Sequence, residues 1–220
     1  MSPTPAAQVV VATNGFTQSN FTSGSETAIS YGVVLQNKSG NVDALGISVT
    51  VSFVDTLGRS VTSNETTVTG IPADGNFYLG GLAASNVSLT VAGMNVTVSV
   101  ASSQAHRLVL PSVSGMSLQS DGFGDESVSG TFTNPYQAPI PSDANIYVVY
   151  IGPQGNVVGG ASETAGAAVE PGHSVAFGFS DLSSWISTFF VQSSSVSSVQ
   201  SSVDPCVSFS SCPAQVPASG

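Results

Sequence analysis

Apolar and polar residues alternate with a period of two along most of this chain, which is the pattern of half-buried β-strands. The clearest run covers residues 47–53, Ile-Ser-Val-Thr-Val-Ser-Phe. Two further runs, 87–91 and 94–100, are separated by Ala92-Gly93 in the manner of a β-hairpin. Val, Thr, Ile and aromatic residues fill these runs, and strong helix formers are scarce. The pattern predicts an all-β protein, with residues 181–186 as the best candidate for a short helical turn.

The two halves of the sequence match when the chain is shifted by 97 residues against itself. The shift places Asn37 on Asn134, Gly58 on Gly155, Gly75 on Gly172, Gly81 on Gly178, Leu82 on Phe179 and Leu89 on Ile186. Each half has the same order of strands, an Asn-bearing loop and Gly turns, which is typical of a β-sandwich. We therefore expect two tandem immunoglobulin-like antiparallel β-sandwich domains, residues 9–103 and 104–191, after an N-terminal linker at 1–8.

The segment around the first Gly turn resembles a known family. Residues 48–61, together with Gly32–Leu35 and Asn37 before them and residues 71–75 after them, are similar to the FxLYD-type immunoglobulin-like domains of prokaryotic envelope proteins. The match covers about 50 residues in each half. It departs from the family pattern at Val54, where Tyr is usual, and at Tyr150-Ile151-Gly152 in the second half. The resemblance implies a β-sandwich in the cell envelope and does not imply an activity.

Composition narrows the classes of partner. Only 7% of residues are charged, the net charge is −10, and the basic residues are Lys38, Arg59 and Arg107 alone. Three scattered cations cannot neutralise a phosphate backbone, so we exclude nucleic-acid binding, and anionic membrane surfaces are excluded by the same reasoning. Ser and Thr make up about a quarter of the chain and provide its polarity. No apolar run is long enough to span a bilayer, and residues 1–5 do not have the pattern of a signal peptide.

The C-terminal residues 192–220 are rich in Ser and Pro, and they predict a tail that carries a small disulfide loop. Cys206 and Cys212 are the only cysteines, and the favoured interpretation is a local disulfide; free thiols and a metal site are the alternatives. A disulfide implies an oxidising compartment, so we expect an extracellular or cell-surface location. A removed signal or anchor would then precede the sequence.

Three short segments contain residue types used in catalysis or metal binding. Gly172-His173-Ser174 partly resembles a nucleophile elbow but lacks the following helix and the final Gly, and we interpret His173 as an exposed turn residue. His106 is interpreted as a solvated linker residue. Asp121, Asp125 and Glu126 form an acidic turn in which Ca²⁺ is the less favoured alternative. We therefore predict no catalytic residue, no metal site and no cofactor.

Surface features indicate binding more than catalysis. Candidate N-glycosylation sequons occur at Asn20, Asn37, Asn64, Asn86 and Asn95. Trp185, Phe189 and Phe190 are interpreted as packing residues, with ligand stacking as the alternative. We predict a non-enzymatic extracellular structural, adhesive or spacer module of a cell-surface or filament-forming protein. Its expected partner is another protein or a second copy, through β-strand edges. The alternative is a carbohydrate- or peptide-binding accessory domain pair of a larger secreted enzyme.

Overall fold

A computed structural model describes residues 6–20, 27–85, 90–120, 126–180 and 193–206. Nearly all regular structure in this part of the chain is extended. The elements are β1 (Val9–Asn20), β2 (Thr27–Asn37), β3 (Val42–Asp55), β4 (Ser60–Ile71), β5 (Asn76–Ser85), β6 (Val91–Ala105), β7 (Ser112–Ser120), β8 (Glu126–Thr133), β9 (Asn145–Ile151), β10 (Val157–Thr164), β11 (Ser174–Ser180), the 3₁₀ turn η1 (Ser193–Ser195) and β12 (Ser198–Asp204). The predicted all-β class is confirmed. The proposed helical turn at 181–186 lies outside the described residues.

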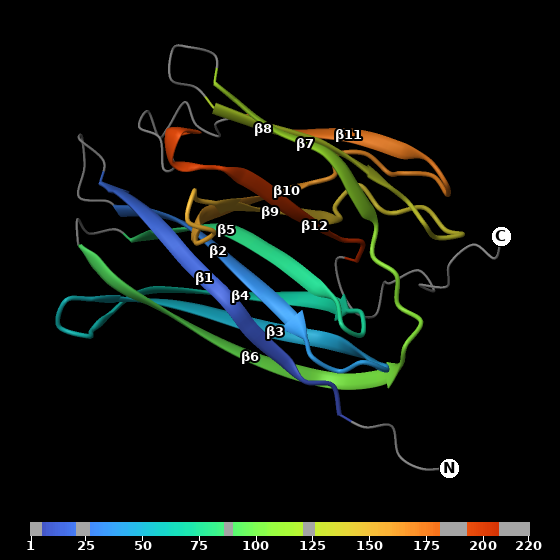
Figure 1. Cartoon of the computed structure of the whole chain (residues 1–220), viewed down its shortest axis with the longest axis horizontal. Helices are drawn as coiled ribbons and strands as arrows, with labels where there is room; N and C mark the ends of the chain where they lie inside the picture. The colour runs from blue at the N-terminus through green and yellow to red at the C-terminus, as the bar shows by residue number, and fades with distance from the viewer. Residues whose placement is uncertain (1–5, 21–26, 86–89, 121–125, 181–192, 207–220) are drawn as a thin grey trace.

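The strands form four antiparallel sheets of three strands each, and the sheets stack as layers. Their strand orders are β4-β3-β6, β1-β2-β5, β10-β9-β12 and β11-β8-β7. Figure 1 shows the layers one above another, with the β3 sheet at the bottom and the β8 sheet at the top. The central strands β3, β2, β9 and β8 each pair with two neighbours, so the remaining eight strands are edges within the described structure.

The lower two layers enclose the first apolar core. Strand β2 contributes Ile29, Tyr31, Val33 and Leu35 on one face, because alternate residues of a strand point the same way. These side chains meet Phe53 and its neighbours on β3. The rings of Tyr31 and Phe53 pack edge to face, with their centroids 5.7 Å apart. This core makes a β-sandwich of the first two sheets.

The upper two layers enclose the second core. Its members include Phe132, Ile146, Val148, Phe179 and Val203, all buried. On β9, the residues between these core positions, Tyr147 and Val149, are also buried, but they pack toward the first half of the chain. Strand β9 is therefore buried on both faces, which explains its continuous apolar sequence.

The two inner sheets meet almost backbone to backbone. A methyl group at Gly80 would collide with the main chain of Val148 and Ala161, and one at Gly32 would lie 2.5 Å from the carbonyl oxygen of Gly159. Ordinary sheets pack about 10 Å apart, because side chains fill the space between them. Glycine removes those side chains, so the two halves of the chain lie closer than two separate domains would.

Hydroxyl groups complete this contact. Strand β10 is an edge strand, yet the Ser30 hydroxyl donates to the Gly160 carbonyl at 2.8 Å and accepts from the Gly160 N–H at 2.9 Å. The Thr17 hydroxyl donates to the Val158 carbonyl at 2.6 Å. Side chains of the neighbouring layer therefore pair main-chain groups of β10, which would cost free energy if they were buried without partners.

The internal repeat is confirmed at its two clearest positions. The buried Asn37 amide donates to the carbonyls of Val42 and Ile71, and the buried Asn134 amide donates in the same way to Ala138 and Val169. Gly58 and Gly155 both have a φ of 76°, a left-handed conformation that favours glycine in a tight turn. Each half therefore uses one Asn to tie its loops together and one Gly to close its central hairpin.

The correspondence between the two halves shifts by one residue at the turn before β5 and β11. The N–H of Gly75 donates to Pro72, whereas in the second half His173, not Gly172, donates to Glu170. Matching Gly75 with Gly172 is therefore wrong by one position, and the same holds for Gly81 with Gly178 and Leu82 with Phe179. The two turns have the same length, so the extra residue of the second half lies before the turn, between Gly155 and Val169. The immunoglobulin-like type of the sandwiches, the domain boundary near residue 104 and the FxLYD-type resemblance stay predictions.

The assignment of residues 192–220 to a tail is wrong for residues 198–204. They form β12, which pairs with β9 from Ser198 opposite Ile151 to Asp204 opposite Asn145. Val199 and Val203 are buried in the second core. The Ser-rich sequence obscured this strand, because only every fourth residue carries a large apolar side chain.

Substituting Gly80 by Ala should lower the free energy of unfolding by about 1–3 kcal/mol or more, because the added methyl overpacks the contact between sheets. Gly178→Ala is the matched control, since its methyl would meet nothing closer than the Val128 carbonyl at 3.7 Å. The control should be neutral or stabilising by about 0.4–1 kcal/mol. Urea unfolding measures both, and equal effects would contradict the close approach.

A chain that ends after Gln192 should lose cooperative unfolding. It lacks β12, so β9 loses one ladder of hydrogen bonds and the second core loses two buried valines. Circular dichroism during thermal or urea unfolding would detect the broadened transition. A truncated chain with the midpoint and slope of the full chain would restore the prediction of a tail.

Candidate functional site

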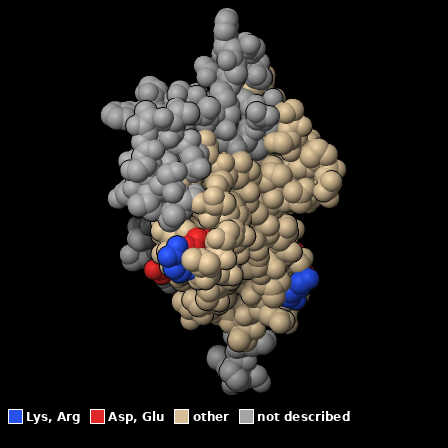
Figure 2. Space-filling view, turned by 90° about the vertical axis from the view of Figure 1, so that its left-hand side faces the viewer, with Lys and Arg blue, Asp and Glu red and all other residues tan. Residues whose placement is uncertain are grey.

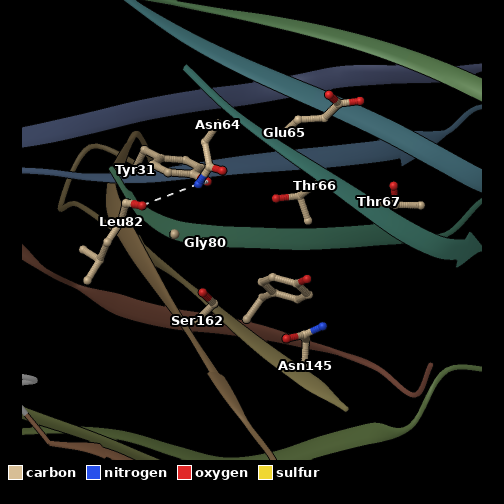
Figure 3. Close-up of a pocket in the computed structure, with 11 residues that line it drawn as sticks. Tyr31, Asn64, Glu65, Thr66, Thr67, Gly80, Leu82, Asn145 and Ser162 are labelled. Atoms are coloured by element: carbon tan, nitrogen blue, oxygen red, sulfur yellow. Dashed lines mark hydrogen bonds between the residues drawn. The ribbon is translucent and has the colours of Figure 1, made fainter. Parts of the chain in front are cut away.

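A cavity of about 340 Å³ opens where three of the four sheets meet. It is lined by Tyr31, Asn64, Glu65, Thr66, Thr67, Gly80, Gly81, Leu82, Asn145, Tyr147 and Ser162. The residues come from β2, β4, β5, β9 and β10, so both halves of the chain contribute to it. Figure 3 shows Thr66 and Thr67 on one side of the space and Ser162 and Asn145 on the other. We call this space the inter-sheet pocket.

The first wall of the inter-sheet pocket is held by hydrogen bonds within the protein. The Asn64 amide donates to the Tyr31 hydroxyl at 3.0 Å and to the Leu82 carbonyl at 3.5 Å. Glu65, the only charged residue among the described lining residues, accepts a hydrogen bond from Ser48 at 3.0 Å. The Asn64 and Tyr31 side chains are therefore positioned before any ligand arrives.

The opposite wall carries polar groups that are not used by the protein. Asn145 and Tyr147 lie two residues apart on β9, and Ser162 pairs with Tyr147 across the sheet, so all three share one face. The Tyr147 ring is buried and packs against Phe77, with the ring centroids 5.7 Å apart. Among the described residues, none forms a hydrogen bond with the side chain of any of these three. The wall thus offers an amide and two hydroxyls to the space.

Both tyrosine hydroxyls of the pocket are neutral. Burial raises the pKa of Tyr31, although hydrogen bonds from Asn64 and Thr66 oppose that rise. Burial, and then the nearby carboxyl of Asp204, raise the pKa of Tyr147. Each hydroxyl keeps its proton at ordinary pH and can both donate and accept a hydrogen bond. A nucleophilic tyrosinate is therefore not formed here.

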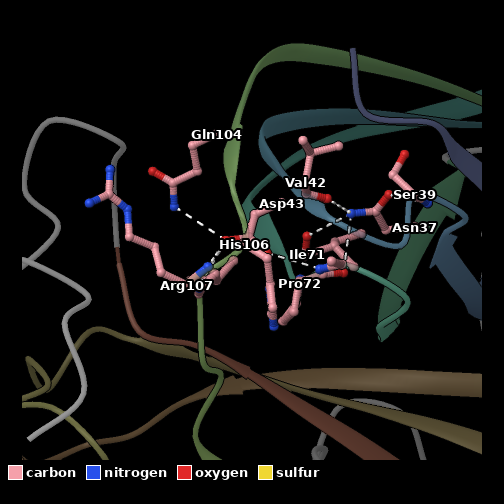
Figure 4. Close-up of polar contacts among 11 residues, drawn as sticks. Asn37, Ser39, Val42, Asp43, Ile71, Pro72, Gln104, His106 and Arg107 are labelled. Atoms are coloured by element: carbon pink, nitrogen blue, oxygen red, sulfur yellow. Dashed lines mark hydrogen bonds and ion pairs between the residues drawn. The ribbon is translucent and has the colours of Figure 1, made fainter. Parts of the chain in front are cut away.

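A second polar cluster lies around Asp43, which is fully buried. Its carboxylate accepts hydrogen bonds from the backbone N–H groups of Ala73, Arg107 and Leu108 at 2.7–2.9 Å. His106 lies 2.6 Å away through Nδ1. Figure 4 shows this carboxylate with Gln104, His106 and Arg107 beside it, next to the Asn37 cluster. Asp43 therefore fixes the segment that leads from the first sandwich into the second.

Two buried aspartates have pKa shifts of opposite direction. Burial would raise the pKa of Asp43, but its hydrogen bonds from His106, Arg107, Leu108 and Ala73 outweigh burial, and the pKa is lowered. Burial dominates at Asp204, and its pKa is raised despite hydrogen bonds from Thr69 and Cys206. Asp43 thus stabilises the fold as a carboxylate, whereas Asp204 favours the fold when protonated.

The histidines are placed differently from one another. His106 is not a free linker residue, since its half-exposed side chain is paired with Asp43. No Ser hydroxyl bonds to that imidazole in the described structure, so a Ser-His-Asp triad is not formed among these residues. The pair instead joins His106 to the buried Asp43. His173 lies exposed in the turn before β11, as the sequence predicts. Across the described residues, no group of three or more His, Cys, Asp or Glu side chains could hold a metal ion.

The sequons divide into three groups. Asn37 is buried and its amide is fully used, so its assignment as a glycosylation candidate is wrong for the folded chain. Asn64 is half-buried and lines the inter-sheet pocket. Asn95 is exposed on β6 and stays a candidate. Asn86 and the side chain of Asn20 lie outside the described residues.

Several other predicted features also fall outside the described structure. They are Cys212, the acids Asp121 and Asp125, the side chain of Glu126, and the aromatic residues Trp185, Phe189 and Phe190. Cys206 is buried after the end of β12, and its disulfide with Cys212 stays a prediction. Within the described part of the chain, no helix has the length and apolar character needed to span a bilayer.

Replacing Asp43 by Asn should destabilise the protein near neutral pH. The substitution puts an amide NH₂, which donates, in place of one carboxylate oxygen that accepts from backbone N–H groups. Each N–H left unsatisfied costs about 1–3 kcal/mol. Because the folded pKa of Asp43 is lowered, its contribution is present above the unfolded value of about 3.9 and is lost as pH falls through the folded value. The difference between wild type and variant should therefore shrink in acid.

Urea unfolding near neutral pH and well below the unfolded pKa of Asp measures this difference. Asp74→Asn is the control, because it removes the same charge from an exposed side chain whose φ of 55° suits Asn. It should change stability little at either pH. A pH-independent loss at Asp43 would show that its charge has no role.

Comparison with known proteins leaves the family open. No family model matches the chain, and no curated protein matches it. Among solved structures, a red sea bream transglutaminase is 14% identical with a TM-score of 0.24, over 92% of this chain and 30% of that protein. Exo-chitosanase CsxA of Amycolatopsis orientalis is 14% identical with a TM-score of 0.20, over 67% of this chain and 22% of the enzyme. A calcium binding mutant of Bacteroides uniformis beta-glucuronidase 2, with two Asp→Ala substitutions, is 10% identical with a TM-score of 0.21, over 79% of this chain and 28% of that protein. The chain thus spans less than a third of each protein, and the TM-scores are too low to indicate a function.

Proposed function

We propose that this protein is a non-enzymatic structural or adhesive module of an extracellular surface or filament-forming protein, and that it assembles with a second copy through the edge of β6. The observation that carries this proposal is the length and composition of that edge. Strand β6 runs for 15 residues without a single Asp, Glu, Lys, Arg or Pro. It is the last strand of its sheet, and within the described structure no strand pairs with its outer edge.

Soluble proteins usually protect an edge strand with charges, proline or a short length, since exposed N–H and C=O groups recruit other strands. The middle of β6 has none of these protections. Val96, Val98 and Val100 lean toward the first core, while Asn95, Thr97 and Ser99 alternate with them toward solvent. Such an edge can extend its sheet by pairing with a copy of itself, and antiparallel pairing of identical strands gives a two-fold dimer.

The charge distribution permits this contact despite the net charge of −10. The residues of β3 that pair with the middle of β6 are uncharged from Ile47 to Val51. Figure 2 shows one face of the molecule on which charged side chains form small groups separated by uncharged surface. Two copies could therefore meet along β6 without placing like charges directly opposite each other.

The positions of the first and last strands favour side-by-side assembly over an in-line spacer. Lys38 donates its N–H to the Gln8 carbonyl, just before β1. The neighbouring Asn37 amide bonds to Ile71, and two residues earlier Thr69 donates to Asp204 at the end of β12. The start of β1 and the end of β12 thus share one pole of the stack (Figure 1). The long strand edges run along its sides.

Sedimentation at increasing concentration tests the proposal. The wild-type chain should show a mass that rises from 22.1 kDa toward that of a dimer. Thr97→Lys places like charges close together at a two-fold contact, and it should weaken association about tenfold or more. A chain that stays monomeric at every concentration would contradict self-association.

The matched control is Ser63→Lys, which adds the same charge to an exposed position of β4, the opposite edge of the same sheet. It should associate like the wild type. If Ser63→Lys blocks association as strongly as Thr97→Lys, the copies do not pair symmetrically through β6. Urea unfolding of both variants confirms that neither effect arises from a loss of folding.

A further inference from the structure

The inter-sheet pocket has the size and chemistry of a binding site that is separate from the β6 edge. Its volume of about 340 Å³ lies at the small end of the range of roughly 300–1,000 Å³ for small-molecule sites. Gly80 and Gly81 are part of its lining, and both are closely approached by other parts of the protein: a methyl at Gly81 would lie 2.5 Å from the Tyr31 hydroxyl oxygen. A larger residue at either position would therefore displace the walls of the pocket.

The groups that line the pocket select for an uncharged polar ligand. The lining contains no Lys, Arg or His, so an anion would find no charge partner there. Glu65 is the single carboxylate among the described lining residues, and one carboxylate on an exposed side chain is too little for a metal ion such as Ca²⁺, which needs six or more oxygens. The remaining polar groups are hydroxyls and amides, which donate and accept hydrogen bonds equally well.

The unpaired polar groups of the second wall point to a ligand that bears several hydroxyls. Asn145, Tyr147 and Ser162 share one sheet face at the pocket, and the described protein offers their side chains no hydrogen bond. Tyr147 lines the space although its side chain is almost wholly buried and its ring packs against Phe77. No buried side-chain N or O atom among the described residues lacks a hydrogen-bond partner, so the Tyr147 hydroxyl is reached by solvent and can bond to water or a ligand.

We infer that the inter-sheet pocket binds one neutral saccharide unit or a polyol of similar size, with Asn145, Tyr147 and Ser162 bonding its hydroxyls on one side and Glu65 accepting from a hydroxyl on the other. This binding goes beyond the proposed assembly through β6 and does not depend on it. The Asn64–Tyr31 pair keeps the first wall in place without rearrangement, which reduces the entropy lost on binding.

Calorimetric titration with glucose, galactose, mannose and N-acetylglucosamine tests the inference, with glucuronate as the anionic counterpart. At least one neutral sugar should bind, and glucuronate should bind more weakly. Tyr147→Phe keeps the ring and its contact with Phe77 but removes the hydroxyl, so it should weaken binding about tenfold. Tyr78→Phe is the matched control, since it removes a tyrosine hydroxyl that does not line the pocket, and it should leave the affinity unchanged.

A second variant covers the case in which Tyr147→Phe folds poorly. Ser162→Leu lies at an exposed position and fills the mouth of the pocket, so it should abolish binding while the urea midpoint stays near that of the wild type. Binding of none of the four neutral sugars, equal binding in Tyr147→Phe and Tyr78→Phe, or preferred binding of glucuronate would each overturn the inference. Sedimentation of the same variants should stay like the wild type, which separates failure of the pocket from failure of assembly.

Discussion

The close approach of the two inner sheets is the constraint on which the rest of the structure depends. Gly32 and Gly80 on one sheet and Gly160 on the other leave no room for a side chain, so main chain meets main chain. That proximity lets Ser30 and Thr17 bond the backbone of β10 directly. Two sandwiches joined in this way behave as one four-layer body, because hinge motion would separate buried polar groups from their partners.

Buried polar side chains fix the connections at one pole of that body. Asn37 and Asn134 hold the loops of the two halves, Asp43 holds the crossing between them, and Asp204 joins the last strand to Thr69. Because this protein has few charged side chains, few ion pairs are available to hold its loops in place. Side-chain bonds to backbone N–H and C=O groups hold the loops instead, at the cost of desolvating the groups involved.

The same packing accounts for both proposed binding surfaces. Among the described strands, eight are edges of the four narrow sheets, and β6 is the longest of these and carries no charge. Where three sheets meet, the inter-sheet pocket remains, with Gly80 and Gly81 in its lining. One surface is a row of backbone groups suited to another strand. The other is a surface hollow lined by hydroxyls and amides, which suits a small polar ligand.

The sequence by itself determined the local structure of this protein. Its period-two alternation placed the middle of β3 and of β6, and the repeat identified the equivalent Asn37 and Asn134, because such features depend on neighbours along the chain. The hairpin expected at Ala92-Gly93 is wrong, because β6 continues through these residues and pairs with β3 there. Only the tertiary structure decided what depends on distant residues: that β12 lies inside a Ser-rich segment, that Asn37 is buried, and that Asp43 holds His106. The inter-sheet pocket belongs to this second group, because its two walls come from segments that lie at least 63 residues apart, the distance from Leu82 to Asn145, and meet only in the folded chain.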